Sequence, residues 1–199
     1  MTTLLQTILG RFRLTTALLL LGISATSLAL ENQGSQHGSA MAAVVTVPGV
    51  GDVAVSAFRD WDVQVASGQA PSIKLTNGNR MNIQLTFIPR RKPRTPSEED
   101  QKSSVRQNAQ RYVTGSVEQE TILKRLPTPM GTAILTNFND LRYQSQPPPV
   151  GEFSSITLGQ VDHELMSIAV TILTQGPETP EHNDALEVLA SLLMVKTET

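Results

Sequence analysis

The feature that most constrains the fold of this chain is an alternating apolar pattern on both sides of an Asn-Gly pair. Asn77-Gly78 lies between two short runs, residues 73–75 and 81–87, in which every second residue is apolar. A period of two places these side chains on one face of a strand, and Asn-Gly is strongly favoured in tight hairpin turns. The pattern predicts an antiparallel hairpin that directs four residues of its second strand into the core: Met81, Ile83, Leu85 and Phe87.

Further strands are predicted before and after this hairpin. Short β-branched or alternating runs indicate strands at residues 44–47, 53–58, 61–65, 117–126, 132–138, 153–161 and 165–173. Trp61 shares the phase of Val63 and Val65, so we expect it to be buried rather than to anchor an interface. A turn is predicted at residues 127–131 and a tight hairpin link at residues 162–164. Short links of this kind indicate antiparallel neighbours.

Two helices are predicted from their start signals. Thr95 and Pro96 fit the N-cap and first position of a helix that runs to residue 114, with a buried stripe at Val105, Ala109, Tyr112 and Val113. Thr179 and Pro180 repeat this start before a second helix that ends near Lys196. Its apolar face comprises Ala185, Leu186, Leu189, Leu192 and Leu193.

The order of these elements predicts the α+β class. Strands, a helix, further strands and a closing helix follow one another. We expect a largely antiparallel β-sheet flanked by two amphipathic helices. This single domain is assigned to residues 44–199, and the small, polar residues 30–43 are assigned to a linker.

The first 29 residues have the pattern of a secretory signal peptide. Arg11 and Arg13 precede an apolar stretch at residues 14–23, and Ser27 and Ala29 offer small residues for cleavage. The apolar run at residues 14–30 has 17 members, of which five are Ser or Thr. An uncleaved membrane anchor is the alternative, at the lower length limit for a span. We expect a periplasmic or secreted bacterial protein with no stable membrane insertion after cleavage.

Composition excludes several classes of chemistry. The chain has no cysteine and three histidines, so disulfides, thiolate catalysis and Cys-ligated metals are excluded. Residues 30–199 carry 14 basic and 18 acidic residues, a net charge of −4, which argues against a nucleic-acid-binding protein. We predict no cofactor and no metal site. The oligomeric state is left open.

No catalytic motif is present, and we assign no catalytic residues. The chain lacks the common nucleophile-elbow, phosphate-binding and zinc-binding patterns. The alternative is a small hydrolase that uses His163 with Ser154 or Ser155 and Asp162, although nothing in their spacing selects them. Asp162, His163 and Glu164 would also make a poor metal cage, because three adjacent residues of one turn cannot surround an ion.

Two exposed loops are candidate partner-binding sites. Residues 80–126 have a net charge of +5 and residues 139–199 a net charge of −7. The positive region is densest in one loop, which could dock an acidic partner, an anionic lipid surface or a polyanion. Alternatively, its charges are solvated or paired with Glu98, Glu99 and Asp100. A proline-rich loop at residues 144–150 could enter a partner groove, or it could simply be a stiff connection. The candidate binding residues are Arg90, Arg91, Lys92 and Arg94 in the first loop, and Gln144, Gln146 and Pro148 in the second.

The order of elements, together with the closing helix Ala185-Leu-Glu-Val-Leu-Ala-Ser-Leu-Leu193, resembles the Mog1/PsbP-like fold over residues 53–194. Exported bacterial proteins with this fold include DcrB-like proteins and periplasmic immunity proteins. The resemblance implies a sandwich and a partner-binding role, and it supplies no catalytic residues to transfer.

The sequence therefore predicts a non-enzymatic periplasmic binding protein whose partner is another protein. An immunity protein, or inhibitor, of a secreted toxin or cell-wall enzyme is one form of this hypothesis. An envelope accessory protein of a membrane or secretion complex is the first alternative, and the small hydrolase is the second.

Overall fold

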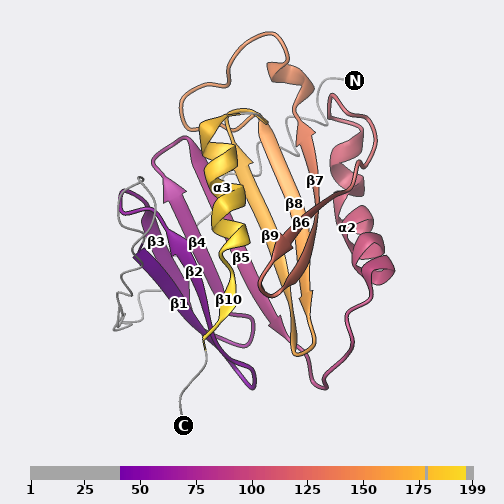
Figure 1. Ribbon diagram of the computed structural model, residues 1–199. Coiled ribbons are helices and arrows are strands. Elements are labelled where there is room, and N and C mark those ends of the chain that lie inside the picture. Colours follow the sequence, from indigo (N-terminus) through magenta and orange to yellow (C-terminus); the bar gives the residue numbers. More distant parts are fainter. Residues whose placement is uncertain (1–40, 178, 196–199) are drawn as a thin grey trace.

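The computed structural model of the chain describes residues 41–177 and 179–195, and shows two antiparallel β-sheets and two α-helices (Figure 1). The predicted signal peptide at residues 1–29 and most of the predicted linker lie outside the described residues. Within the described ranges, no helix is long and apolar enough to cross a membrane.

The larger sheet has seven strands, and every neighbouring pair in it is antiparallel. This confirms the predicted α+β class with a largely antiparallel sheet. From one edge to the other, its strands are β3 (Asp62–Ala66), β4 (Ser72–Asn77), β5 (Met81–Pro89), β9 (Met166–Thr174), β8 (Ser155–His163), β7 (Gly131–Asn139) and β6 (Lys124–Thr128).

The smaller sheet has three strands in the order β1-β2-β10. Strand β1 (Met41–Val47) pairs along its whole length with β2 (Gly51–Ala57), and β2 also pairs with the short β10 (Leu193–Met194). Strand β1 thus includes residues 41–43, which were assigned to the linker.

The predicted hairpin is confirmed as β4 and β5. Asn77 pairs with Met81, the Arg80 N–H donates to the Asn77 carbonyl at 3.0 Å, and Gly78 has φ of +51°. Glycine adopts this left-handed conformation without steric cost. The four residues predicted to face inward, Met81, Ile83, Leu85 and Phe87, are all fully buried.

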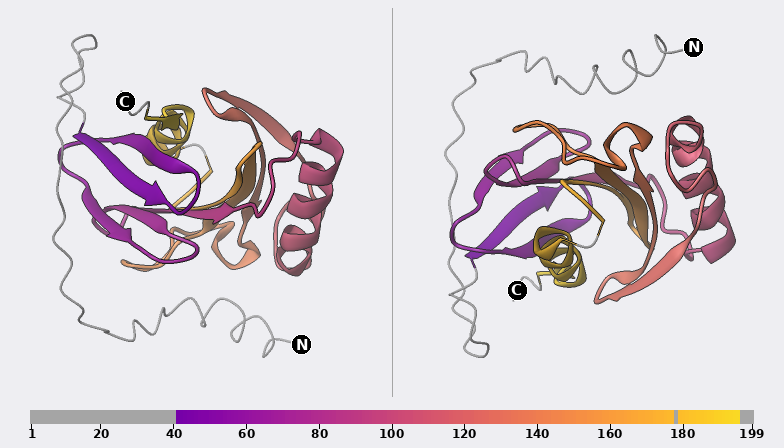
Figure 2. Two further views of the ribbon diagram at one scale, coloured as in Figure 1. Left: turned by 90° about the horizontal axis from the view of Figure 1, so that it is seen from below. Right: turned by 90° about the horizontal axis from the view of Figure 1, so that it is seen from above.

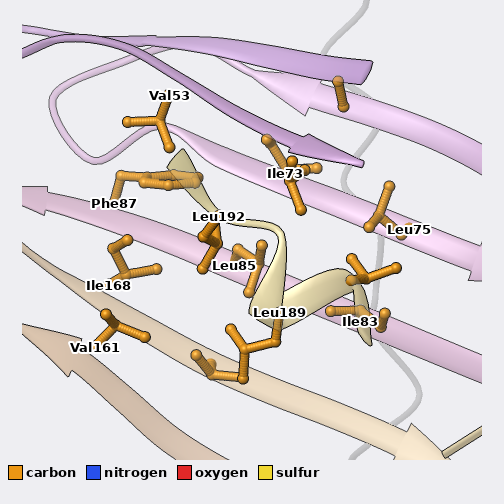
Figure 3. Packing of buried hydrophobic residues seen from close by; sticks show 14 of the residues in the cluster. Val53, Ile73, Leu75, Ile83, Leu85, Phe87, Val161, Ile168, Leu189 and Leu192 are labelled. Carbon is orange, nitrogen blue, oxygen red and sulfur yellow. The ribbon is translucent and has the colours of Figure 1, made fainter. Parts of the chain in front are cut away.

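The main core lies between the two sheets and helix α3 (Pro180–Ala190). The larger sheet curves around α3, which contacts β2, β5, β6 and β9 (Figure 2). Leu189 and Leu192 pack among the apolar residues of both sheets (Figure 3). Trp61 is 5% exposed and belongs to the same cluster, as predicted.

Helix α2 (Glu98–Val113) covers the other face of the larger sheet, over β7 and β8. The predicted stripe is buried at Val105, Ala109 and Tyr112, and the Tyr112 ring stacks on Phe138 with centroids 6.1 Å apart. The predicted cap was wrong by two residues. Ser97, rather than Thr95, caps the helix and accepts the Asp100 N–H.

Other boundaries also differ from the predictions. The link predicted at residues 162–164 is shifted, because Asp162 and His163 belong to β8 and pair with β9. The strand predicted at residues 117–126 is observed as the shorter β6, which starts at Lys124 and ends at Thr128. Pro127 and Thr128 pair with β7, so the turn between β6 and β7 is shorter than predicted. Helix α3 begins at Thr179-Pro180 as predicted but ends at Ala190, not near Lys196. Leu193 is 43% exposed because it lies in β10, and Val188 takes its place in the core.

The first turn of α3 makes stability sensitive to pH. The Nδ1 atom of His182 is buried without a hydrogen-bond partner among the described residues. Burial, reinforced by the positive charge of Lys124, lowers the pKa of His182. The unfolded chain takes up a proton near pH 6.5 and the folded chain resists it, so folding stability is complete above that pH and falls as the pH drops below it.

We therefore expect His182→Gln to lose less stability than the wild type between about pH 7.5 and about pH 5. Urea denaturation at both pH values measures this difference. An equal loss in the wild type and in His182→Gln would show that this histidine is not responsible.

Candidate functional site: an anchored basic loop and the adjoining pocket

Residues 89–96, here called the basic loop, connect β5 to α2 and run past the β8–β9 turn. The Arg90 N–H donates to the Leu165 carbonyl at 2.8 Å, and the Arg94 N–H donates to the Glu164 carbonyl at 2.9 Å. The two acceptors belong to adjacent residues, whose Cα atoms are only about 3.8 Å apart. Residues 90 and 94 are therefore both held at the β8–β9 turn, and the exposed residues 91–93 form the apex of the loop between them.

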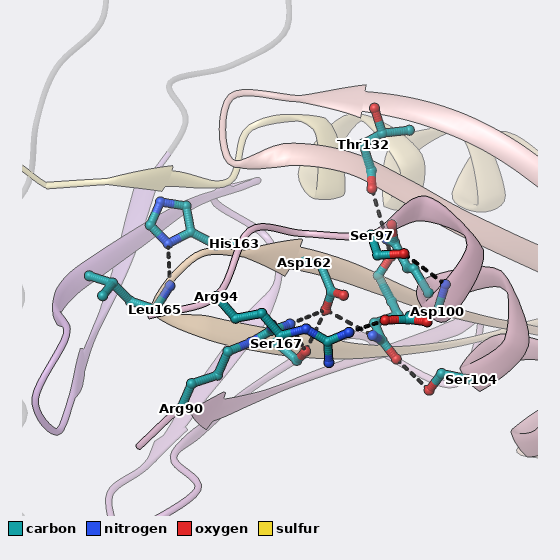
Figure 4. A network of polar contacts seen from close by, with 12 residues as sticks. Arg90, Arg94, Ser97, Asp100, Ser104, Thr132, Asp162, His163, Leu165 and Ser167 are labelled. Carbon is teal, nitrogen blue, oxygen red and sulfur yellow. Dashed lines mark hydrogen bonds and ion pairs between the residues drawn. The ribbon is translucent and has the colours of Figure 1, made fainter. Parts of the chain in front are cut away.

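The side chain of Arg90 also anchors the loop. Its guanidinium lies 2.9 Å from Oδ1 of Asp162, and it donates to Ser167 Oγ at the same distance (Figure 4). The same Asp162 oxygen accepts the Ser167 hydroxyl and the Gln160 amide. The side chains of Arg90 and Asp162 are 17% and 6% exposed, so this ion pair is largely shielded from water.

The four basic residues predicted to bind a partner fall into two groups. Arg90 pairs with Asp162 and Arg94 pairs with Asp100. Arg91 and Lys92, at the apex, are exposed and form no ion pair within the described part of the chain. Of these four residues, Arg91 and Lys92 are therefore the two whose charges have no counter-charge within the described residues.

The second predicted loop lies at the opposite end of the larger sheet (Figure 1). At one end of the sheet, Pro89 of β5 pairs with Met166, and the basic loop follows. At the other end, Met81 pairs with Thr174 and Thr174 pairs with Ser155. The proline-rich loop lies beyond this second end. The nine residues of β5 separate the two ends by about 27 Å. Gln144 and Gln146 are exposed and Pro148 is half-buried, but the structure does not bring these residues together with the basic loop.

A pocket of about 390 Å³ lies beside the basic loop, at the start of α2. Four segments form it: the end of the basic loop, the first turns of α2, the β6–β7 turn and the β8–β9 turn. The lining residues are Pro96, Glu98, Gln101, Met130, Gly131, Thr132, Asp162, His163 and Glu164.

Gln101 connects the walls of this pocket. It is 4% exposed, and its Nε2 donates to the carbonyls of Thr132 at 2.8 Å and Gln160 at 2.5 Å. These bonds tie the first turn of α2 to β7 and β8. Gln101 was not among the residues predicted from the sequence, where its signal is a glutamine one turn before the apolar stripe that begins at Val105.

The residues of the hydrolase alternative are not gathered into one site. Ser155 and His163 are the two ends of β8, so eight residues, or about 27 Å, separate them along the strand. Asp162 and His163 point to opposite faces because they are neighbours on a strand, and Nδ1 of His163 accepts the Leu165 N–H at 3.3 Å (Figure 4).

The comparisons with known proteins assign no family. No family model matches the chain, and no curated protein matches it. A crystal structure from Bacteroides thetaiotaomicron VPI-5482 aligns with 72% of this chain at 11% identity and a TM-score of 0.42. The alignment covers 45% of that protein, so this chain spans less than half of its length. We therefore infer neither the fold nor the function of this chain from that structure.

Proposed function

We propose that this chain is a non-enzymatic binding protein that presents the apex of its basic loop to an acidic surface of another protein. The observation that carries the proposal is the anchoring of the loop. Two main-chain hydrogen bonds and the Arg90–Asp162 ion pair hold its base, and Arg91 and Lys92 project from it. A loop already ordered before binding loses little entropy in a complex.

The charges of the apex support an acidic protein partner. Two cations placed side by side attract a negatively charged surface and steer its approach. The proline residues 89, 93 and 96 restrict the backbone of the loop further. An inhibitor that inserts this apex into an acidic cleft of a toxin or cell-wall enzyme is the form of the proposal we favour, in a periplasmic or secreted setting. An envelope accessory protein would use the same surface.

The specific fold family is also part of the proposal. We propose a Mog1/PsbP-like sandwich, supported by the order of the elements and by the placement of α2 and α3 on opposite faces of the larger sheet.

Reversing the charges of the apex should remove the partner without disturbing the fold. We expect the double variant Arg91→Glu with Lys92→Glu to bind its partner at least about tenfold more weakly at low salt, since like charges then face each other. The measurement is affinity capture from bacterial envelope extracts with the full chain as bait, followed by quantitative mass spectrometry and titration of the captured protein.

The matched control is Arg59→Glu with Arg106→Glu, which makes the same change in net charge at two exposed positions outside the loop. This control should retain the partner. If both double variants lose it equally, then net charge rather than the apex is responsible, and the proposed docking site is wrong.

A further inference from the structure

The pocket beside the basic loop contains a buried carboxylate with one oxygen unused. Every hydrogen bond and ion pair of the Asp162 side chain is made by Oδ1, which contacts Arg90, Gln160 and Ser167. Oδ2 has no partner among the described residues, and it is not sealed from solvent. Asp162 is only 7% exposed, and it is one of the residues that line the pocket.

A second buried acceptor is placed in the same way. Both bonds of the Gln101 side chain are made by Nε2, so its carbonyl oxygen Oε1 is unpaired among the described residues. Gln101 is 4% exposed and lines the same pocket. Neither oxygen is among the sealed, unpaired polar atoms of the described residues, so both are open to solvent at the pocket. Two such acceptors at one pocket match a ligand that donates hydrogen bonds.

The other residues that line the pocket indicate which kind of hydrogen-bond donor fits it. Glu164 is exposed at the pocket and forms no ion pair within the described ranges, so it adds a free negative charge. Glu98 is neutralised by Lys102 at 2.9 Å and Arg125 at 3.0 Å. Met130, which is 4% exposed, supplies an apolar wall that an alkyl chain can contact.

A metal ion is a poorer match for these walls than an organic cation. The described residues contain no group of three or more His, Asp or Glu side chains placed to hold a metal. An alkylammonium or guanidinium group instead donates several hydrogen bonds, and its methylene stem suits an apolar wall. The volume of about 390 Å³ is within the usual range for small-molecule sites.

We propose that this pocket binds a small organic cation, an alkylammonium or guanidinium group, between the free oxygens of Asp162 and Gln101. Glu164 attracts the cation and Met130 contacts its stem. The ligand is either a free amine or the side chain of a lysine or arginine in a peptide. This inference does not depend on the proposed docking of the loop apex, which uses Arg91 and Lys92.

The test is a titration of the ¹⁵N-labelled full chain with n-butylammonium chloride, followed by ¹H–¹⁵N correlation spectra. We expect saturating shifts at the amides of Gly131 and Thr132 and at the side-chain amide of Gln101. The neutral compound 1-butanol, which has the same number of non-hydrogen atoms, should not produce them. An N-acetylated, C-amidated Gly-Lys-Gly tripeptide that binds more tightly than n-butylammonium identifies a peptide side chain as the ligand, and weaker binding identifies a free amine.

Two variants make the test specific. Asp162→Asn keeps an oxygen for Arg90 and puts an NH₂ donor in place of Oδ2, so n-butylammonium should bind about tenfold more weakly. Glu164→Gln changes a side chain that makes no ion pair, and it should weaken binding about threefold while the protein stays folded.

Three results would overturn the inference. The first is an absence of saturation, or shifts spread over the acidic surface that tetramethylammonium reproduces. The second is unchanged affinity in both variants, with spectra that show them to be folded. The third is tighter saturation of the same amides by calcium chloride, which would assign the pocket to a metal ion.

Discussion

Replacing Arg90 with alanine should lower the free energy of unfolding by about 3 kcal/mol, because it leaves the buried carboxylate of Asp162 without its counter-charge. We place the loss at the low end of the range for buried ion pairs because the Arg90 side chain is still 17% exposed. Urea denaturation at neutral pH measures it. Arg91→Ala, one residue along the same loop, should change stability by less than about 0.5 kcal/mol.

A double replacement separates the loss of the pair from a general disturbance of the loop. Arg90→Met combined with Asp162→Leu removes both charges, and it should recover most of the stability lost in Arg90→Ala. Equal losses in Arg90→Ala and Arg91→Ala would contradict the anchoring of the loop. The anchor also links stability to binding, because Arg90→Ala should weaken partner binding even though Arg91 and Lys92 remain.

Phe87→Ala should cost about 4 kcal/mol of unfolding free energy, which is typical of a large aromatic side chain removed from a well-packed core. Phe87 is fully buried on β5 and belongs to the cluster that both sheets and α3 share (Figure 3). Its deletion leaves a cavity that neighbours on several elements would have to fill. Thermal or urea denaturation measures the change.

The next residue of the strand gives the matched control. Ile88 points to the opposite face of β5 and is 47% exposed, so Ile88→Ala should cost less than about 1 kcal/mol. A one-residue shift in the register of β5 would exchange the two faces. A larger loss for Ile88→Ala than for Phe87→Ala would therefore contradict the strand register described here.

The elements that were predicted correctly are those whose sequence signals lie within a few neighbouring residues. The β4–β5 hairpin combines a turn pair with a period of two, and Thr179-Pro180 places a cap and a helix start side by side. At α2 the same Thr-Pro signal was misleading. The Arg94 N–H is bonded to the Glu164 carbonyl, so the chain enters α2 from a non-helical anchor and Ser97 becomes the cap.

The site was predicted only in part, because its components come from distant segments. A run of basic residues identifies the basic loop, but which of them remain free depends on the partners that strand pairing brings to it. Arg90 follows β5 and Asp162 lies on β8. Only β9 separates these two strands in the sheet, so the Arg90 guanidinium reaches the Asp162 carboxylate. Gln101 and Met130 belong to one pocket for a similar reason, and no local pattern links residues so far apart in the sequence.

Amide hydrogen exchange on the full chain, alone and with the captured partner, tests the central claim most directly. In the free protein, the amides of Arg90 and Arg94 should exchange slowly because both donate to main-chain carbonyls, and those of Arg91 and Lys92 should exchange fast. The partner should then slow exchange at Arg91 and Lys92. Fast exchange at Arg90 and Arg94 in the free protein would contradict the anchored loop, and protection by the partner at Gln144 and Gln146 instead would move the interface to the opposite end of the sheet.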